Sequence, residues 1–370
     1  MSNLPPKTSQ GNAVKGRRYI VSHCPRSEAN TASALPDPCA CENLLAEWFG
    51  RPVILLASGR TGLHLFLRAL EFNRNRHKLQ VPPYLSRCVM NAVTESAFPV
   101  QAPQPADGVL FYHQYGASQC CSPRCDVVVE DIAHGFFASP DSGSRAWFGN
   151  AAIFSLPKFF GMSGLAGGLI IDPGETEERI RDTVWNSPAD PSGVRAWMRT
   201  TISGDSGEMA EPLFVESAYE LLLKLFRPDP RDLIGFPRSL DAIYSIGKER
   251  AERVSFFEQY FGENNKTFRS FRGSQDQTLP FALPYFGSGD PKALDRANRA
   301  LEEQAIEAGI YHVDVRRNMY DPEYRPCLLI PCHQDIPMDL FESICATVRD
   351  HDATEPVAIF AEPVLAAHQV

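Results

Sequence analysis

The sequence predicts an α/β fold: a mostly parallel central sheet with helices on both faces, followed by a smaller α+β C-terminal domain. Two observations indicate it. Short apolar runs alternate with segments of helical periodicity through the first 170 residues, and the pattern changes after a long helical stretch near residue 240. We expect a flexible N-terminal arm at residues 1–40, a large domain at 41–240 and a small domain at 241–370.

Composition excludes several classes of function. The 370 residues are 22% charged with a formal net charge of −9, and no basic run is present, so nucleic-acid binding is not expected. The first 24 residues lack the apolar core of a signal peptide, and no stretch approaches the roughly 20 apolar residues that cross a bilayer, so we expect a cytoplasmic protein without membrane contact. The ten cysteines show no Cys-x-x-Cys spacing, so free thiols are favoured and zinc is a minor alternative.

The elements of the large domain follow in order along the chain. Helical periodicity appears at residues 42–50, 61–72 and 86–97, and strand-like apolar runs occupy 52–58, 78–85, 108–116, 125–133 and 151–156. Ligands bind at the carboxyl ends of strands in such sheets. Polar residues do follow the strands at three places: Ser58–Thr61, Glu130–Asp131 and Ser155–Lys158.

The rest of the chain is assigned by the same patterns. Residues 211–226 and 239–261 have helical periodicity and would lead the chain out of the first domain. Segments 279–287, 291–310, 327–333 and 338–350 then give strand, helix, strand and helix. This order suits a small α+β domain.

Lys158 is the residue with the clearest chemical potential. It lies between "AAIFSLP" and "FFGMSGLAGG", so we expect a partly apolar pocket that disfavours its charged form. A neutral lysine amine forms an imine with a carbonyl compound, and the commonest such compound in proteins is pyridoxal 5′-phosphate (PLP). This cofactor also needs an acid for its pyridine nitrogen and a cradle for its phosphate.

The sequence offers candidates for both needs. Asp131 ends an apolar strand, where a buried carboxylate is costly without a cation such as a pyridinium. The segment Ser58–Thr61 joins a strand to a helix N-terminus, which favours an anion, and Arg60 adds a donor suited to phosphate.

Each candidate also has an ordinary structural interpretation. Asp131 could be a helix cap or a surface acid, and Ser58–Thr61 could be a simple turn and cap. Lys158 could be a loop lysine, and His134 a packed polar residue. The three segments together, in this order in one α/β domain, favour a PLP site.

These residues and their surrounding segments resemble those of the PLP-dependent sugar aminotransferases of the DegT/DnrJ/StrS type, which have the fold type I architecture of PLP enzymes. The resemblance runs from about residue 43 to 350. Six segments carry it in the family's order: "LLASGRTGLHLFLRAL", "VPPYLSRCVMNAVTESAFPV", "LFYHQYGA", "VVEDIAHG", "AIFSLPKFFGMSGLAGGLI" and "LLIPCHQDI".

The resemblance implies a role for each matched residue. Lys158 would hold PLP as an imine and move the proton between substrate and cofactor. Asp131 would pair with the pyridine nitrogen, and His134 would stand beside the ring hydroxyl. Gly59, Arg60 and Ser155 would bind the phosphate, and Ser58 and Thr61 would also line the cofactor site. It further implies a homodimer that takes an amino group from glutamate or a similar donor and delivers it to a keto group of a nucleotide-linked sugar.

Three departures from the family pattern limit what it implies. Ser86 occupies the position of the aromatic residue that covers the ring, with Tyr84 as a candidate substitute. The spacing from Lys158 to Gly167 and Gly168 is longer than usual, and the family's Gly-x-Asn-x-Arg-Met segment is missing, with residues 185–193 in that region. These departures bear on the identity of the acceptor more than on the identity of the cofactor.

Two alternatives therefore stay open. One is a PLP enzyme with another reaction or a non-sugar acceptor; Lys158 argues against the family's dehydratase branch, which carries histidine there. The other is a non-catalytic regulatory relative. The polar insert at about 185–210 and the loop 313–326 could shape the acceptor pocket, with Arg316 and Arg317 as anion ligands or as part of a solvated charged loop.

Overall fold

The computed structural model describes residues 19–20, 35–138, 149–162, 164–187, 193, 223, 226–262, 266–272, 278–288 and 290–352. Most of the expected N-terminal arm, the polar insert at about 185–210 and nearly all of the helix expected at 211–226 lie outside these residues.

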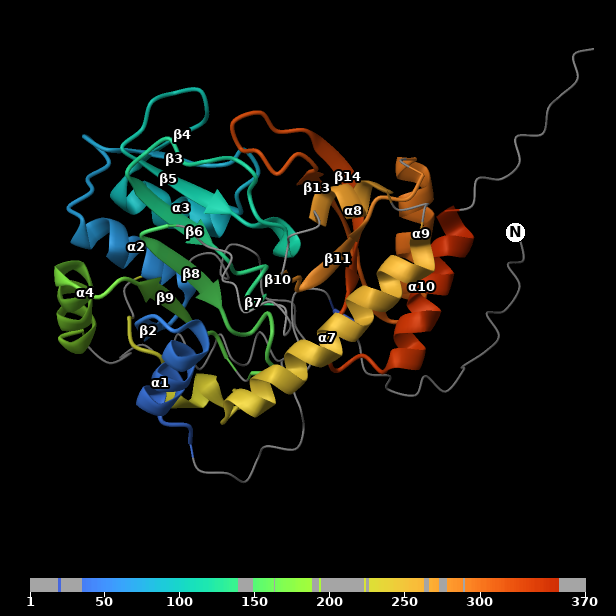
Figure 1. The fold of residues 1–370 in the computed structure, drawn as a ribbon, viewed down its shortest axis with the longest axis horizontal. Helices are drawn as coiled ribbons and strands as arrows, with labels where there is room; N and C mark the ends of the chain where they lie inside the picture. The colour runs from blue at the N-terminus through green and yellow to red at the C-terminus, as the bar shows by residue number, and fades with distance from the viewer. Residues whose placement is uncertain are drawn as a thin grey trace, which may run out of the picture.

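A seven-stranded sheet forms the larger half of the molecule, on the left of Figure 1. Its strand order is β2-β9-β8-β6-β5-β3-β4, and only β9 runs antiparallel to its neighbours. The strands are β2 (Val53–Leu56), β3 (Lys78–Gln80), β4 (Phe98–Val100), β5 (Gly108–Tyr112), β6 (Val127–Asp131), β8 (Ala151–Ser155) and β9 (Gly167–Ile171). The predicted mostly parallel sheet is confirmed.

Helices cover both faces of this sheet because its strands are apolar on both sides. Ile54 and Leu56 of β2 pack in a cluster with α2 (Gly59–Ala69), α3 (Arg87–Ser96) and α4 (Glu175–Trp185). Val53 and Leu55 pack on the opposite face with α1 (Pro38–Phe49). The helix expected at 61–72 begins two residues earlier, because the side chain of Ser58 accepts a hydrogen bond from the Thr61 N–H and caps it.

The smaller half contains the antiparallel sheet β11-β14-β13, formed by β11 (Ala282–Tyr285), β13 (Gly309–Asp314) and β14 (Tyr324–Pro331). Helices α9 (Pro291–Glu303) and α10 (Met338–Asp352) pack side by side against it. The long helix α7 (Leu240–Phe261), capped by Ser239, connects the two halves (Figure 1). The domain boundary near residue 240, where α7 begins, stays a prediction.

Several short elements complete the described chain. Two small sheets pair β1 (Tyr19–Ile20) with β12 (Ile306–Glu307) and β7 (Phe137–Ala138) with β10 (Thr278–Leu279). The remaining elements are the 3₁₀ turns η2 (Gln114–Gly116) and η3 (Pro230–Leu233) and the helix α8 (Lys266–Arg272).

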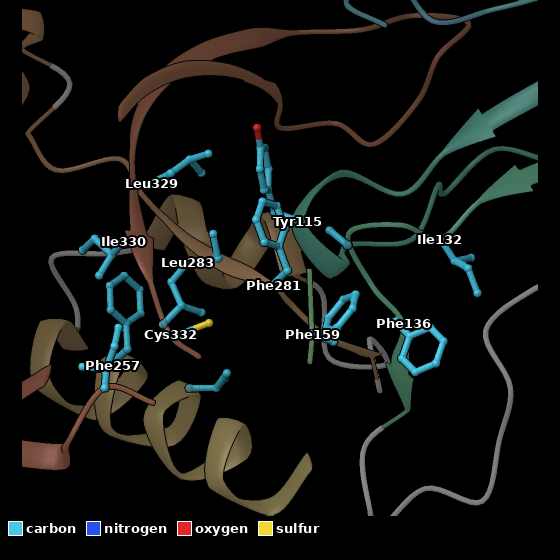
Figure 2. Packing of buried hydrophobic residues seen from close by; sticks show 14 of the residues in the cluster. Tyr115, Ile132, Phe136, Phe159, Phe257, Phe281, Leu283, Leu329, Ile330 and Cys332 are labelled. Atoms are coloured by element: carbon cyan, nitrogen blue, oxygen red, sulfur yellow. The ribbon is translucent and has the colours of Figure 1, made fainter. Parts of the chain in front are cut away.

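One apolar cluster joins the two sheets. It contains Phe136 and Phe159 from beside the large sheet, Phe257 from α7, and Leu283 and Leu329 from the small sheet (Figure 2). The two halves therefore share buried surface, and the end of the large sheet that carries the candidate residues is built on this shared core.

Within the described residues, the nine cysteines are free thiols and no group of side chains is arranged to hold a metal ion. None of the helices described here combines the length and the apolar character needed to pass through a lipid bilayer.

Candidate active site

The parallel strands bring the predicted residues to one edge of the large sheet. Strands β2, β6 and β8 run in the same direction, because β2 and β8 are each antiparallel to β9 and β8 is parallel to β6. Their carboxyl ends lead into Ser58, Asp131 and Ser155 respectively, and Lys158 follows Ser155 by three residues. Ligands bind at the carboxyl ends of parallel strands, and the structure brings the residues predicted from this rule to the same edge of the sheet.

Asp131 and Lys158 form the electrostatic pair of the site. Asp131 is 4% exposed, and its Oδ1 accepts a hydrogen bond from the Ala133 N–H at 2.9 Å. Burial raises the pKa of Asp131, and the charge of Lys158 opposes that rise. Burial lowers the pKa of the Lys158 amine to about 8, with Asp131 opposing the change. About a tenth of this amine is therefore uncharged at pH 7, far more than for a lysine of ordinary pKa, and the uncharged form is the nucleophile.

The starts of two helices flank the lysine. Arg60, in the first turn of α2, acts electrostatically to lower the pKa of Lys158, and Cys88, at the start of α3, acts to raise it. Cys88 Sγ lies 3.3 Å from Ser86 Oγ. Ser86 therefore lies close to the site, although its small side chain is exposed and cannot cover a ring as an aromatic residue would.

Glycines allow the start of α2 to approach the end of β8. A Cβ atom on Gly59 would come within 2.6 Å of the Phe154 carbonyl oxygen, and one on Gly167 would collide with that same oxygen and approach the Gly59 nitrogen to 2.6 Å. Gly167 is paired with Ser155 across β8 and β9. The hydroxyl of Ser155 thus lies beside a helix N-terminus whose N–H groups and dipole favour an anion.

A cluster of rings surrounds His134. Its imidazole is buried and stacks on Tyr115, with ring centroids 4.8 Å apart, and Phe281 lies 4.4 Å away by the same measure. Tyr115 and Phe281 are close to each other in Figure 2. The Lys158 Nζ is 5.3 Å from the Phe281 ring centroid, so this cluster borders the amine. Burial, and secondarily Lys158, hold the pKa of His134 well below its ordinary value.

The backbone of Lys158 is held from the other half of the molecule. Arg250 of α7 is fully buried and donates hydrogen bonds to the carbonyl oxygens of Lys158 and Phe159, both at 3.3 Å. Gln334, after β14, accepts from Arg250 Nε at 3.1 Å and donates to the Phe159 carbonyl at 3.0 Å. These bonds connect the lysine loop to α7 and to the chain that follows the small sheet.

Glu130, next to Asp131, faces away from the site as alternation along a strand requires. Its Oε2 lies 2.8 Å from His113 Nε2, and its Oε1 accepts from the Gly149 N–H at 2.5 Å. The Gln119 N–H donates to His113 Nδ1, so the proton of His113 is on Nε2 and points to Glu130. This buried pair lies on the opposite face of β6 from Asp131 and stabilises the strand that carries it.

Other predicted residues lie at the rim or support the site. The hydroxyls of Ser58 and Thr61 lie 3.0 Å apart within the helix cap, so both residues shape the start of α2. Tyr84 is 59% exposed and packs edge-on against Tyr324, with centroids 4.3 Å apart. Its assignment as the residue over the cofactor ring stays a prediction.

The loop arginines have partners of their own. Arg316 forms ion pairs with Asp321 and Glu323, and Arg317 donates to the Arg272 carbonyl at 3.1 Å. This favours the interpretation of a charged, solvated loop for Arg316. The role of either residue in the acceptor pocket remains a prediction.

Four further residues belong to the site although no sequence motif marked them: Tyr112, Phe281, Arg250 and Gln334. Tyr112 could have been found from strand pairing, since it ends β5 directly opposite Asp131 in the parallel register. The other three come from elements distant in the sequence, and local patterns hold no signal for them.

Residues 49–175 match the sequence family described as "Putative PLP-dependent aminotransferase". This range contains all ten predicted site residues. No curated protein sequence matches the chain significantly.

The solved structures give a broader likeness of fold. DesV of S. venezuelae superposes with a TM-score of 0.61 and 16% identity over 88% of this chain and 92% of that one. A DegT DnrJ EryC1 StrS aminotransferase from Brucella abortus gives 0.57 and 13% over 86% and 91%. "Putative sugar aminotransferase Spr1654 from Streptococcus pneumoniae, PMP-form" gives 0.58 and 14% over 88% and 92%.

The donor set fits PLP. Lys158 provides an amine of lowered pKa, Asp131 a buried carboxylate for a cationic nitrogen, and the glycine-backed start of α2 a place for the phosphate. The chain thus has the fold of the DegT/DnrJ/EryC1/StrS aminotransferases, and its family match points to a PLP-dependent aminotransferase.

Proposed function

We propose that this chain transfers the amino group of glutamate, or of a similar donor, to a keto group of a nucleotide-linked sugar. One observation carries the catalytic part of the proposal. The Lys158 amine, with a pKa lowered to about 8, interacts electrostatically with the buried carboxylate of Asp131 and with Arg60 at the glycine-backed start of α2. An amine and a carboxylate so arranged suit proton transfer at a carbon next to a cofactor-bound nitrogen.

Each side chain has a task in this proposal. PLP, when bound, supplies the electron sink that acidifies the substrate carbon. Lys158 takes a proton from that carbon and returns it. Asp131 would hold the cationic ring nitrogen, which would balance the cost of burying its carboxylate. His134 would stand beside the ring hydroxyl. The side chains of Arg60 and Ser155 and the N–H groups that follow Ser58 would bind the phosphate.

The sugar acceptor and the homodimer are the finer part of the proposal. The resemblance of the six sequence segments supports both, as does the likeness of fold to a structure described as a sugar aminotransferase. The rim of the site adds exposed tyrosines, Tyr84 and Tyr311, of the kind that pack against rings of a ligand.

The two half-reactions can be tested separately. The purified chain with PLP is mixed with glutamate, and 2-oxoglutarate and the change of the cofactor's absorbance are measured. The amine-loaded protein is then screened against keto-sugar nucleotides and against simple 2-oxo acids. Formation of 2-oxoglutarate without turnover of any keto sugar would retain the aminotransferase and reject the sugar acceptor. Binding of PLP without any 2-oxoglutarate would reject glutamate as donor. Sedimentation velocity of the loaded protein tests the homodimer.

A further inference from the structure

Tyr112 is a partly buried phenol in the site, and the proposed function gives it no task. It is the last residue of β5 and is paired directly with Asp131, the last residue of β6. Paired residues of neighbouring strands project from the same face of a sheet. The phenol therefore stands beside the carboxylate, and the charge of Asp131 contributes to raising the pKa of Tyr112.

The hydroxyl of Tyr112 is hydrogen-bonded to His134. It lies 2.5 Å from Nδ1 and 3.5 Å from Nε2, so Nδ1 is the partner. Burial keeps both groups uncharged near neutral pH, because it raises the pKa of Tyr112 and lowers that of His134. A neutral imidazole has one donor nitrogen and one acceptor nitrogen. The phenol O–H is the more acidic group and donates, which leaves the proton of His134 on Nε2.

The plane of the imidazole is set independently of its tautomer. Tyr115 stacks on it at an interplanar angle of 26°, and Phe281 packs at 40° with its centroid 4.4 Å away. The Phe281 N–H also donates to the His134 carbonyl oxygen at 3.3 Å. The two aromatic rings hold the plane of the imidazole, and the hydrogen bond from Tyr112 determines which of its nitrogens carries the proton.

We propose that Tyr112 is a positioning residue that holds His134 in the Nε2–H tautomer, so that the imidazole is a neutral hydrogen-bond donor to the ring oxygen of the cofactor. This inference rests on the proposed function for the location of the cofactor ring beside His134. A neutral donor suits this site because burial and the adjacent Lys158 disfavour a second positive charge on the imidazole. A second group that fixes the tautomer of a functional histidine is a recurrent device in enzymes.

The test compares Tyr112→Phe with Tyr285→Phe. Tyr285 is buried, and its hydroxyl donates to Asp352 Oδ2, at the end of α10, at 2.8 Å, so this variant also removes one phenol hydrogen bond. The full-length protein is labelled with ¹⁵N-histidine, the His134 signals are assigned with His134→Gln, and the two ring nitrogens are observed with and without PLP.

In the unaltered protein we expect Nδ1 without a proton and Nε2 protonated. Tyr112→Phe should lose this single tautomer, shift the pH midpoint of the PLP absorbance band, and slow the glutamate half-reaction about tenfold, the cost of one lost hydrogen bond, with little change in the KM of the donor. Tyr285→Phe should leave the ¹⁵N signals and the band as they are.

Two results would overturn the proposal. One is a proton on Nδ1 of His134 in the unaltered protein, which needs no variant to be observed. The other is a Tyr112→Phe protein with unchanged ¹⁵N signals and an unchanged absorbance titration. If the protein binds no PLP, the proposed function fails, while the spectrum of the cofactor-free protein still decides the tautomer.

Discussion

The charge state of Lys158 governs how readily the protein can take up its cofactor. Burial lowers the pKa of the amine to about 8 from the ordinary 10.5. The uncharged amine reacts with an aldehyde, and its fraction rises with pH until the pKa is passed. We therefore expect the rate of PLP uptake by cofactor-free protein to rise with pH, with a midpoint about pH 8, and then to level off. Stopped-flow absorbance measures this rate.

Lys158→Ala is the control for that measurement and should give no long-wavelength band at any pH. A midpoint above pH 10 in the unaltered protein would mean that the amine is solvated like a surface lysine, and would contradict the environment described for it.

Asp131 and Glu130 provide a matched pair of carboxylates, adjacent on β6 but facing opposite sides of the sheet. Asp131→Asn keeps an oxygen to accept from the Ala133 N–H but removes the charge that faces the site. We expect PLP to bind more weakly and the glutamate half-reaction to slow about 100-fold or more, in the range of general acid–base effects. Titration with PLP and single-turnover absorbance measure these changes.

Glu130→Gln should have the opposite profile. It weakens the buried contact with His113 and leaves the site face intact, so the free energy of unfolding should fall by about 1–3 kcal/mol while the PLP band stays. Equal effects of the two substitutions on PLP binding would show that the orientation of the two carboxylates is wrong.

At the scale of elements, α7 determines where the lysine loop lies. Arg250 donates to the carbonyl oxygens of Lys158 and Phe159, and a buried carbonyl left without its partner costs about 1–3 kcal/mol. Arg250→Met should therefore increase amide hydrogen exchange in residues 156–162 and weaken PLP binding. Mass spectrometry of the exchanged peptides measures the first effect.

Arg253→Met is the comparison for that experiment. Arg253 is on the same helix and donates to the carbonyl oxygens of Gln334 and Ile336, so its loss should be felt first in residues 334–336. If both substitutions raise exchange equally in 156–162, the local role of Arg250 is refuted.

The sequence indicated the elements better than it indicated their contacts. Apolar periodicity and the carboxyl-edge rule were sufficient to predict that Asp131, Lys158 and Ser58–Thr61 lie at one edge of the large sheet, because each comes at or after the end of a strand of that sheet. Strand β9 was not predicted, since its glycines, which allow close contact with Gly59 and Phe154, weaken the strand pattern. Phe281 and Arg250 reach the site only through tertiary packing, which no local pattern encodes.

At the scale of the whole molecule, the shared core determines how the protein unfolds. The cluster that contains Phe136, Phe159 and Phe257 continues without a break to Leu283 and Leu329 of the small sheet. Separating the two halves would expose this surface to water, with a free-energy cost of about 25 cal/mol for each Å² of apolar area. We expect a single cooperative transition in denaturant, although the chain length and pattern predict two domains.

Hydrogen exchange measured in β6 and β8 reports on the large sheet, and hydrogen exchange in β14 and α10 reports on the small half. Coincident unfolding midpoints in the two regions are expected. Because PLP would bind only the folded site, saturating cofactor should raise both midpoints together. At a PLP concentration 100 times its Kd, the free energy of unfolding should increase by about 2.7 kcal/mol. Stabilisation confined to the large-sheet region would contradict one cooperative unit, since the hydrogen bonds from Arg250 and Gln334 join the lysine loop to both halves.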